Sequence, residues 1–302
     1  MELIRPNTNF DFIRYAKAAI TASVIVILLG IASLIFKGGP TYGIDFAGGT
    51  LVQIKFSSDT SATDLRKALG VLDLRGLSIQ QFGDQANEYL VRVQEDNNLA
   101  MLSGQIQSTL EGQYGKGKLE IRRTEMVGPQ VGKDLRGKAI QAIIFAIIGM
   151  LIYVTFRFEF RFGVGAVIAL VHDVLITLTA FSLLNLEIDL TIIAAFLTIV
   201  GYSVNDTVVI CDRIRENMGK YHELPLAQII NRSLNETLSR TILTSGLTLL
   251  SVIALYLFGG SVLHNFAFAL LVGMIAGVYS TVFIASPILI IWENWRGKRQ
   301  PV

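Results

Sequence analysis

The chain has 302 residues, of which 52% are hydrophobic and 17% are charged, and this composition is too apolar for an ordinary soluble protein. Its formal net charge of +2 is nearly neutral, so charge gives no support for nucleic-acid binding. The single cysteine, Cys211, excludes an internal disulfide, and the three histidines stand in no zinc-ligand pattern. The sequence has no phosphate-binding glycine loop either, so we expect no metal and no cofactor.

Residues 1–17 mix aromatic and basic side chains, as segments at a membrane surface do, and we expect them at the cytoplasmic surface. Residues 18–36 follow without a charge over nearly the thickness of a bilayer. No convincing cleavage site comes after them. We therefore expect an uncleaved first transmembrane span rather than a secretory signal.

Residues 37–132 have mixed charges and short alternating segments, which are typical of a soluble domain. The pattern predicts strands at 50–56, 77–82, 88–94 and 119–127, a helix at 63–70 after an N-cap threonine, and a second helix at 98–114. The order βαββαβ predicts a small ferredoxin-like α+β sandwich. Its acids and bases are scattered along solvated faces, so we expect no active site in this domain.

Five further apolar runs lie within residues 133–292. They predict spans at 140–156, 162–184, 190–211, 241–258 and 262–292, the last with an interfacial end that carries Trp292. Between the fourth and fifth spans, residues 212–239 are expected to form a cytoplasmic loop with an amphipathic helix over 226–238. Residues 293–302 are expected to form a tail. The fold class is therefore an α-helical polytopic membrane protein with six transmembrane helices.

The distribution of lysine and arginine predicts the orientation. Bases lie between spans two and three, between spans four and five, and after span six, whereas the loops near 185–189 and 259–265 contain none. The positive-inside rule then places both termini in the cytoplasm and domain 37–132 across the membrane. Bases at the start of the second span run against the rule, which large translocated domains largely escape.

An acid within the fourth span, Asp206, lies about a turn and a half from the charged end of that span. A carboxylate inside a membrane is costly, so it usually faces the bundle interior and finds a partner. Arg240, which opens the fifth span, is the predicted partner. Nearby polar side chains that could hydrogen-bond this pair or a water chain are Ser203, Asn205, Thr207, Ser239 and Thr241. The pattern supports a proton relay, with a structural ion pair that fixes two helices together as the alternative.

Asp173 lies near the middle of the third span, beside His172. If it also faces the interior, one protonation path involves both acids, with His172 as a titratable neighbour. Alternatively, His172 hydrogen-bonds to a neighbouring helix. An intramembrane aspartyl protease needs a GxGD or Tyr-Asp context, whereas this chain has His-Asp and Asn-Asp, so we do not expect an enzyme.

Residues 43–49, GIDFAGG, join the first span to the soluble domain. The three glycines Gly43, Gly48 and Gly49, together with Asp45, predict a hinge that passes motion to the domain. A fixed turn is equally compatible with this sequence.

Long motifs over nearly the whole chain resemble the SecF family, whose members are subunits of the bacterial SecDF protein-translocation machinery and relatives of the RND transporters. The motifs are TYGIDFAGGT at 41–50, LVHDV in the third span, VGYSVNDTVVICDRIREN at 200–217, NRSLNETLSRTILTSGLTLL at 231–250 and FAFALLVGMIAGVYSTVFIASP at 266–287. The resemblance implies one six-span, RND-type half in the bacterial cytoplasmic (inner) membrane.

The resemblance also implies the partners and the energy source. It implies pairing with SecD, association with the SecYEG channel and YajC, an indirect link to the ATPase SecA, and preproteins as substrates. The proton-motive force would drive late steps of translocation, with the acid of VND and the base of LSRT, here Asp206 and Arg240, carrying proton transport. Asp173 joins this predicted relay through its depth in the membrane. A half of an RND-like lipid or small-molecule exporter, or a passive assembly subunit, is the alternative.

Overall fold

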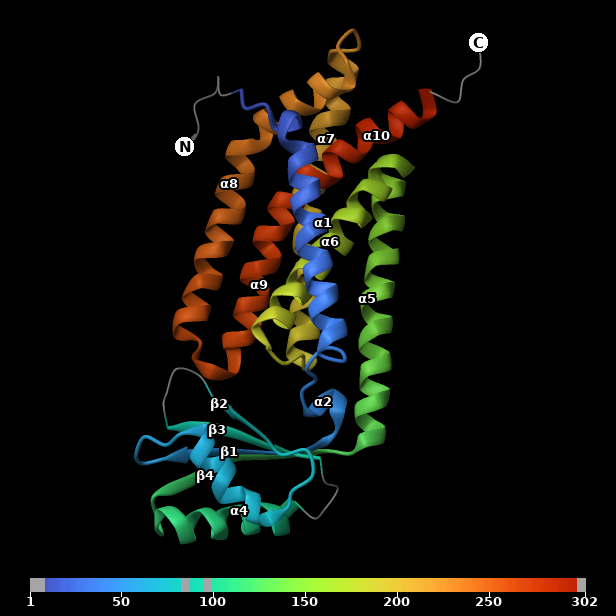
Figure 1. The fold of residues 1–302 in the computed structure, drawn as a ribbon. Helices are drawn as coiled ribbons and strands as arrows, with labels where there is room; N and C mark the ends of the chain where they lie inside the picture. The colour runs from blue at the N-terminus through green and yellow to red at the C-terminus, as the bar shows by residue number, and fades with distance from the viewer. Residues whose placement is uncertain (1–8, 83–86, 95–98, 298–302) are drawn as a thin grey trace.

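The structure is a computed structural model that describes residues 9–82, 87–94 and 99–297 (Figure 1). A bundle of long helices occupies one part of the molecule, and a small sheet domain lies at one end of this bundle. The start of helix α1 and the whole of helix α10 lie at the opposite end of the bundle. The two ends of the described chain are therefore on the same side, away from the sheet.

Within the described residues, six helical segments are long and apolar enough to cross a membrane. They are α1 (Phe12–Phe36), α5 (Pro129–Arg157), α6 (Phe160–Leu184), α7 (Leu190–Lys220), α8 (Leu226–Phe258) and a last run made of α9 (Gly260–Ser280), a π-helical turn (Thr281–Ala285) and α10 (Ser286–Gly297). The predicted fold class is confirmed by these helices and by the sheet domain described below.

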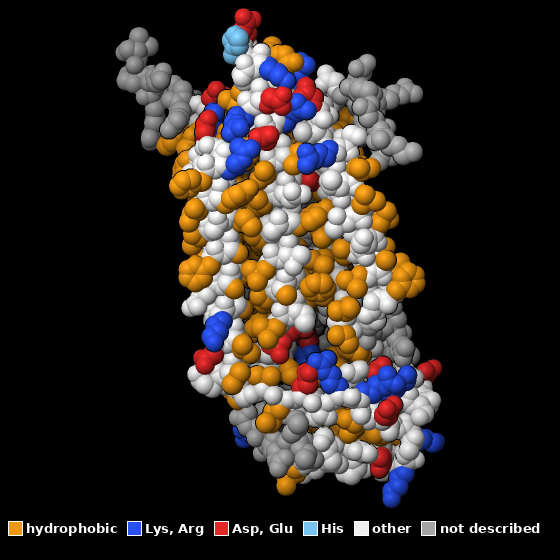
Figure 2. Space-filling view, turned by 180° about the vertical axis from the view of Figure 1, so that it is seen from behind, with side chains coloured by type: hydrophobic (Ala, Val, Ile, Leu, Met, Phe, Trp, Pro, Cys, Tyr) orange, Lys and Arg blue, Asp and Glu red, His pale blue; other side chains and the backbone are white. Residues whose placement is uncertain are grey.

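The outer surface of the bundle is an apolar belt bounded at both ends by charged side chains (Figure 2). Helices α1, α5 and α8 supply much of this belt with exposed hydrophobic side chains such as Leu28, Phe145 and Leu247. Helices α6, α7 and α9 bury far more of their apolar windows and form the centre of the bundle. An exposed apolar surface of this extent is stable against lipid and not against water.

Three element boundaries differ from the sequence prediction. Helix α1 begins at Phe12, inside the predicted interfacial segment 1–17, of which residues 1–8 lie outside the described part of the chain. Helix α5 begins at Pro129, before the predicted domain boundary at 132. Within the predicted cytoplasmic segment 212–239, α7 continues to Lys220, and α8 begins at Leu226, where the amphipathic helix was predicted, and continues without a break into the fifth span. An apolar run marks only the part of a helix that contacts lipid. The helix itself can continue through charged residues on either side, as long as its backbone hydrogen bonds continue.

The sixth predicted span contains a break in its helical pattern. The π-helical turn at 281–285 separates α9 from α10, which leans away from the bundle axis in Figure 1. The Ser286 hydroxyl donates to the Thr281 carbonyl oxygen across this turn at 2.9 Å. Single π-helical turns inside α-helices are frequent at functional sites.

The sheet domain contains α2 (Ile44–Ala47), β1 (Gly49–Phe56), α3 (Ala62–Leu69), a 3-10 turn (Gly70–Leu72), β2 (Ser78–Gln81), β3 (Glu88–Val93), α4 (Leu99–Tyr114) and β4 (Leu119–Val127). The strand order β2-β3-β1-β4, with antiparallel neighbours throughout, is that of the predicted ferredoxin-like sandwich. The N-cap of α3 is Ser61 and not the predicted threonine, since the Ser61 hydroxyl accepts from the Asp64 amide.

One face of the sheet packs against α3 and α4, and the core between them includes Val52, Ile54, Leu65 and Ile106. Successive side chains of a strand point to opposite faces, so Leu51, Leu90 and Arg92 lie on the other face. Because α4 lies on the side of the sheet away from the bundle, this second face is turned toward the bundle (Figure 1).

Candidate functional site

The most buried acid of the bundle is Asp173, in the middle of α6, with 1% of its surface exposed. Its Oδ2 atom accepts hydrogen bonds from the hydroxyls of Ser203, at 2.7 Å, and Ser280, at 3.0 Å. Its Oδ1 atom lies 3.0 Å from the Nδ1 atom of His172. Since Ser203 belongs to α7 and Ser280 to α9, one carboxylate connects the three central helices.

The network extends from His172 to the first helix. The Nε2 atom of His172 lies 3.1 Å from the Ser23 hydroxyl, which donates to the Tyr279 hydroxyl at 3.1 Å. The Tyr279 hydroxyl in turn donates to the Ala19 carbonyl oxygen at 2.7 Å. The imidazole also stacks on the Tyr279 ring, with 5.8 Å between ring centroids. His172 is therefore both the neighbour of Asp173 and a hydrogen-bond partner of another helix, as the two sequence interpretations proposed separately.

Two glycines of α9 allow this close approach. A Cβ atom on Gly277 would lie 3.1 Å from the Ser203 hydroxyl and 3.5 Å from Oδ2 of Asp173. A Cβ atom on Gly273, one turn earlier, would lie 2.2 Å from the side chain of Ile199. Small residues at such spacing let membrane helices pack backbone to backbone. The polar contacts of Asp173 thus depend on glycine at 277.

The second acid, Asp206 of α7, is 7% exposed, and its Oδ2 atom accepts a hydrogen bond from the Ser245 hydroxyl of α8 at 2.9 Å. Asp206 and Arg240, both among the described residues, form no direct ion pair within 4.0 Å, and Arg240 is exposed, although its charge acts on the Asp206 carboxylate through space. Five residues of a helix turn through about 140° beyond one full turn, so Ser245 and Arg240 cannot both face α7. The serine takes the inward position.

The predicted supporting side chains divide into two groups. Ser203 and Thr207 are buried at the centre, and the Thr207 hydroxyl lies 2.9 Å from that of Thr281 in the π-helical turn. Asn205 is exposed and Ser239 is only half-buried. Four hydroxyl side chains that take part in these contacts were not predicted from the sequence: Ser23, Ser245, Tyr279 and Ser280. Hydroxyl groups are common in membrane helices, and only helix packing tells which of them face an acid.

The predicted hinge residues form a close-packed turn in this structure. The Gly43 amide donates to the Ile188 carbonyl oxygen at 2.9 Å, and Oδ2 of Asp45 accepts from the Leu190 amide at 3.0 Å. Gly49 has φ +112°, and a Cβ atom there would lie 2.4 Å from the Val93 carbonyl oxygen. These contacts favour the fixed turn over a freely moving hinge.

A six-span bundle with two buried carboxylates on adjacent central helices, and with a ferredoxin-like domain at one end, defines a multi-pass membrane transport subunit. Residues 106–295 match the C-terminal family of SecD/SecF protein export membrane proteins, and residues 33–60 match the SecD/SecF GG motif. The chain belongs to the SecF family of protein translocase subunits.

Proteins named SecF match this chain over nearly its full length. Protein translocase subunit SecF of Magnetococcus marinus is 46% identical, with coverage of 100% of this chain and 97% of the relative. The subunit of the same name from Calditerrivibrio nitroreducens is 43% identical, with 98% of both chains covered. The crystal structure of SecDF from Thermus thermophilus, a translocon-associated membrane protein, is 36% identical with a TM-score of 0.87. The match covers 97% of this chain but 40% of that longer SecDF chain.

Proposed function

We propose that this subunit works with SecD to use the proton-motive force for late steps of preprotein translocation across the bacterial cytoplasmic membrane. The observation that carries the proposal is the pair of buried carboxylates, Asp173 and Asp206, on adjacent helices, each of which accepts a hydrogen bond from a serine hydroxyl of another helix. Neither is paired with lysine or arginine among the described residues. An acid buried in a membrane without a cation is a natural acceptor of protons.

Protonation of Asp173 changes what its neighbours must do. The ionised carboxylate accepts from both Ser203 and Ser280. The neutral acid gains an O–H donor and loses acceptor strength, so the hydrogen bonds from the two hydroxyls weaken. Because these hydroxyls belong to α7 and α9, the contacts between the central helices change with the proton. One elementary charge moved across the membrane contributes roughly 2.3 kcal/mol per 100 mV, enough to shift two packings a few kcal/mol apart.

The proposed SecD-binding surface runs along α7 and along the part of α8 where this helix enters the membrane. Thr198, Gly201 and Asn205 are exposed on α7 at intervals of three and four residues, and Arg240 is exposed on α8. Small side chains allow a partner helix to approach closely, and an arginine facing lipid is costly. We therefore place a SecD helix with a carboxylate opposite Arg240. The Thermus structure supports a SecD partner, since this chain matches 40% of a longer SecDF chain.

The remaining partners and the orientation follow from the family. We propose association with SecYEG and YajC, an indirect link to SecA, and preproteins as substrates. The bases at the helix ends remote from the sheet support cytoplasmic termini and an extracytoplasmic sheet domain. Relatives named as protein translocase subunits favour this function over a lipid or small-molecule exporter.

Preprotein export into vesicles that hold the full complex, with and without a proton gradient, tests the proposal. Asp173→Asn and Asp206→Asn should assemble with SecD and lose the gradient-dependent part of export, whereas Arg240→Met should lose it together with part of the SecD contact. The matched control is Asp212→Asn, which removes an exposed acid of α7 that lies 3.3 Å from Arg157 in a surface ion pair of little energetic weight. Normal gradient-dependent export by both buried-acid variants would contradict the proposal.

A further inference from the structure

We propose that the loop at residues 185–190, between α6 and α7, is a rigid joint that passes motion of the bundle to the sheet domain, with Asp45, Arg92 and Glu187 as its positioning residues. This inference rests on the proposed function, since it names the part of the molecule through which proton-driven motion leaves the membrane. This joint differs from the hinge expected in residues 43–49, because these residues move together with the loop as one body and do not bend.

The backbone of the segment that enters the sheet domain is paired with this loop. The Ile188 amide donates to the Thr41 carbonyl oxygen at 2.8 Å, and the Gly43 amide donates to the Ile188 carbonyl oxygen at 2.9 Å. Tyr42 and Ile188 form an isolated parallel β-bridge. A Cβ atom on Gly43 would lie 3.1 Å from the Asp189 side chain, so glycine permits this approach. The loop and the segment are thus held by the same bonds that hold two strands.

The first turn of α7 is capped from both sides of the joint. Asp189 is its N-cap, and Oδ1 of Asp189 accepts from the Ile192 amide at 3.0 Å. Oδ2 of Asp45, which belongs to the short helix α2, accepts from the Leu190 amide at 3.0 Å. Carboxylates at a helix N-terminus bind free amides and are favoured by the helix dipole. A movement of α7 along or about its axis therefore acts directly on α2.

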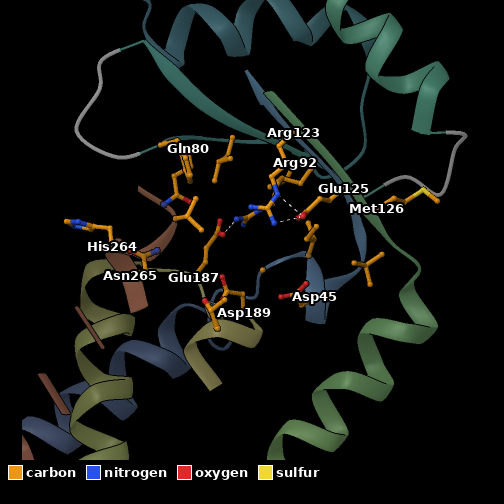
Figure 3. A pocket seen from close by; sticks show the side chains of 18 of the residues that line it. Asp45, Gln80, Arg92, Arg123, Glu125, Met126, Glu187, Asp189, His264 and Asn265 are labelled. Carbon is orange, nitrogen blue, oxygen red and sulfur yellow. Dashed lines mark hydrogen bonds and ion pairs between the residues drawn. The ribbon is translucent and has the colours of Figure 1, made fainter. Parts of the chain in front are cut away.

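An ion pair ties the sheet itself to the loop. Arg92, on the face of β3 that looks toward the bundle, pairs with Glu187, and their side chains are only 16% and 11% exposed. This pair lies in a cavity of about 550 Å³ that both residues line. Figure 3 shows it between the sheet and the end of the bundle. Burial lowers the pKa of the Arg92 guanidinium to about 10, against the opposing influence of Asp189 and Asp45. Arg92 therefore stays charged throughout the physiological pH range.

The position of the loop makes it sensitive to the buried acids. It directly connects α6, which carries Asp173, to α7, which carries Asp206. A change in the packing of these two helices must displace the loop or strain it. A second anchor holds the same region, because a Cβ atom on Gly132 of α5 would lie 3.1 Å from the Phe46 carbonyl oxygen. Motion of α7 relative to α5 would then tilt the sheet domain about this second contact.

The test weakens the joint and then restores it covalently in the full complex. Glu187→Gln and Arg92→Gln should lower gradient-dependent export about threefold to tenfold and leave gradient-independent export unchanged. The pair Tyr42→Cys/Ile188→Cys places two cysteines at bridged positions of neighbouring strands, which lie roughly 4.8 Å apart, a spacing that a disulfide accepts. The single native cysteine, Cys211, is buried in the bundle and does not compete.

In the oxidised state, this cysteine pair should keep wild-type export and should rescue Glu187→Gln, and reductant should remove the rescue. The two single-cysteine variants, which form no disulfide, control for loss of the Tyr42 and Ile188 side chains. If oxidation abolishes gradient-dependent export, the joint must open and the inference is wrong. If Glu187→Gln and Arg92→Gln export like the wild type, it is equally wrong. Loss of the gradient effect in the wild type would instead overturn the proposed function.

Discussion

The hydroxyl of Ser203 donates a 2.7 Å hydrogen bond to the carboxylate of Asp173, and this bond joins α7 to the middle of α6. Ser203 precedes Asp206 by three residues, so a single turn of α7 holds the contact to one acid and carries the other acid. The protonation state of Asp173 and the position of Asp206 are therefore coupled through this turn.

Replacing Ser203 tests that coupling. Ser203→Ala removes one donor to a buried carboxylate, a bond of about 1.5–3 kcal/mol, and leaves Ser280 and His172 in place. We expect the variant to fold and to lose most gradient-dependent export. Ser251→Ala, which removes an exposed hydroxyl of α8, is the control and should export normally. Export in inverted vesicles measures both, and equal activity of the two variants would show that the Ser203 contact has no role.

The glycine beside this contact gives a second prediction. Gly277→Ala places a Cβ atom 3.1 Å from the Ser203 hydroxyl, so the hydroxyl or the helix must shift. We expect reduced gradient-dependent export and a lower melting temperature of the purified complex. Gly246→Ala introduces the same methyl group where no atom lies within 4 Å, and it should leave both quantities unchanged or raise stability slightly. A tolerated Gly277→Ala would argue against close packing around Asp173.

Gly49 distinguishes a fixed turn from a hinge. Gly49→Ala combines a positive φ with a Cβ contact of 2.4 Å to the Val93 carbonyl oxygen, and strain of about 1–3 kcal/mol is expected from the backbone alone. The melting temperature should fall clearly. Gly117 also has a positive φ, but a Cβ atom there meets open space, so Gly117→Ala should lower the melting temperature less. Calorimetry measures the melting temperature of both variants, and an equal fall in both would mean that the turn at Gly49 is not closely packed.

The exposed arginine of α8 gives a prediction about assembly. Arg240→Leu should weaken copurification of SecD, because the variant loses the charge that the proposed SecD carboxylate faces. Arg232→Leu removes a base on the same helix that is paired with Glu236 and lies outside the apolar belt, so SecD should copurify as with the wild type. Undiminished copurification with Arg240→Leu would place the SecD contact elsewhere.

The sequence predicted most of the helices and strands, but it did not predict which side chains of each transmembrane helix face the other helices. Long apolar runs predicted every span, since a membrane helix must satisfy its own backbone and expose apolar side chains. Period-two and period-3.6 patterns predicted the four strands and the helices α3 and α4 of the sheet domain, but not the short helix α2. Asp206 and Arg240 make no direct ion pair, because two charges at a similar depth need not face each other, but the charge of Arg240 still acts on Asp206. Ser245 and Ser280, which do face the acids, carry no signal that separates them from other hydroxyl residues in the spans.

A measurement of proton flux decides whether the buried acids carry protons. Inverted vesicles that hold the complete SecDF and SecYEG complex, with a pH-sensitive dye in the lumen, report proton release from the lumen while a preprotein is translocated. Translocation should accelerate this release in the wild type and in Asp212→Asn. It should not accelerate the release in Asp173→Asn or Asp206→Asn. Accelerated release with both buried acids replaced would show that protons cross by a route that does not involve this chain's carboxylates.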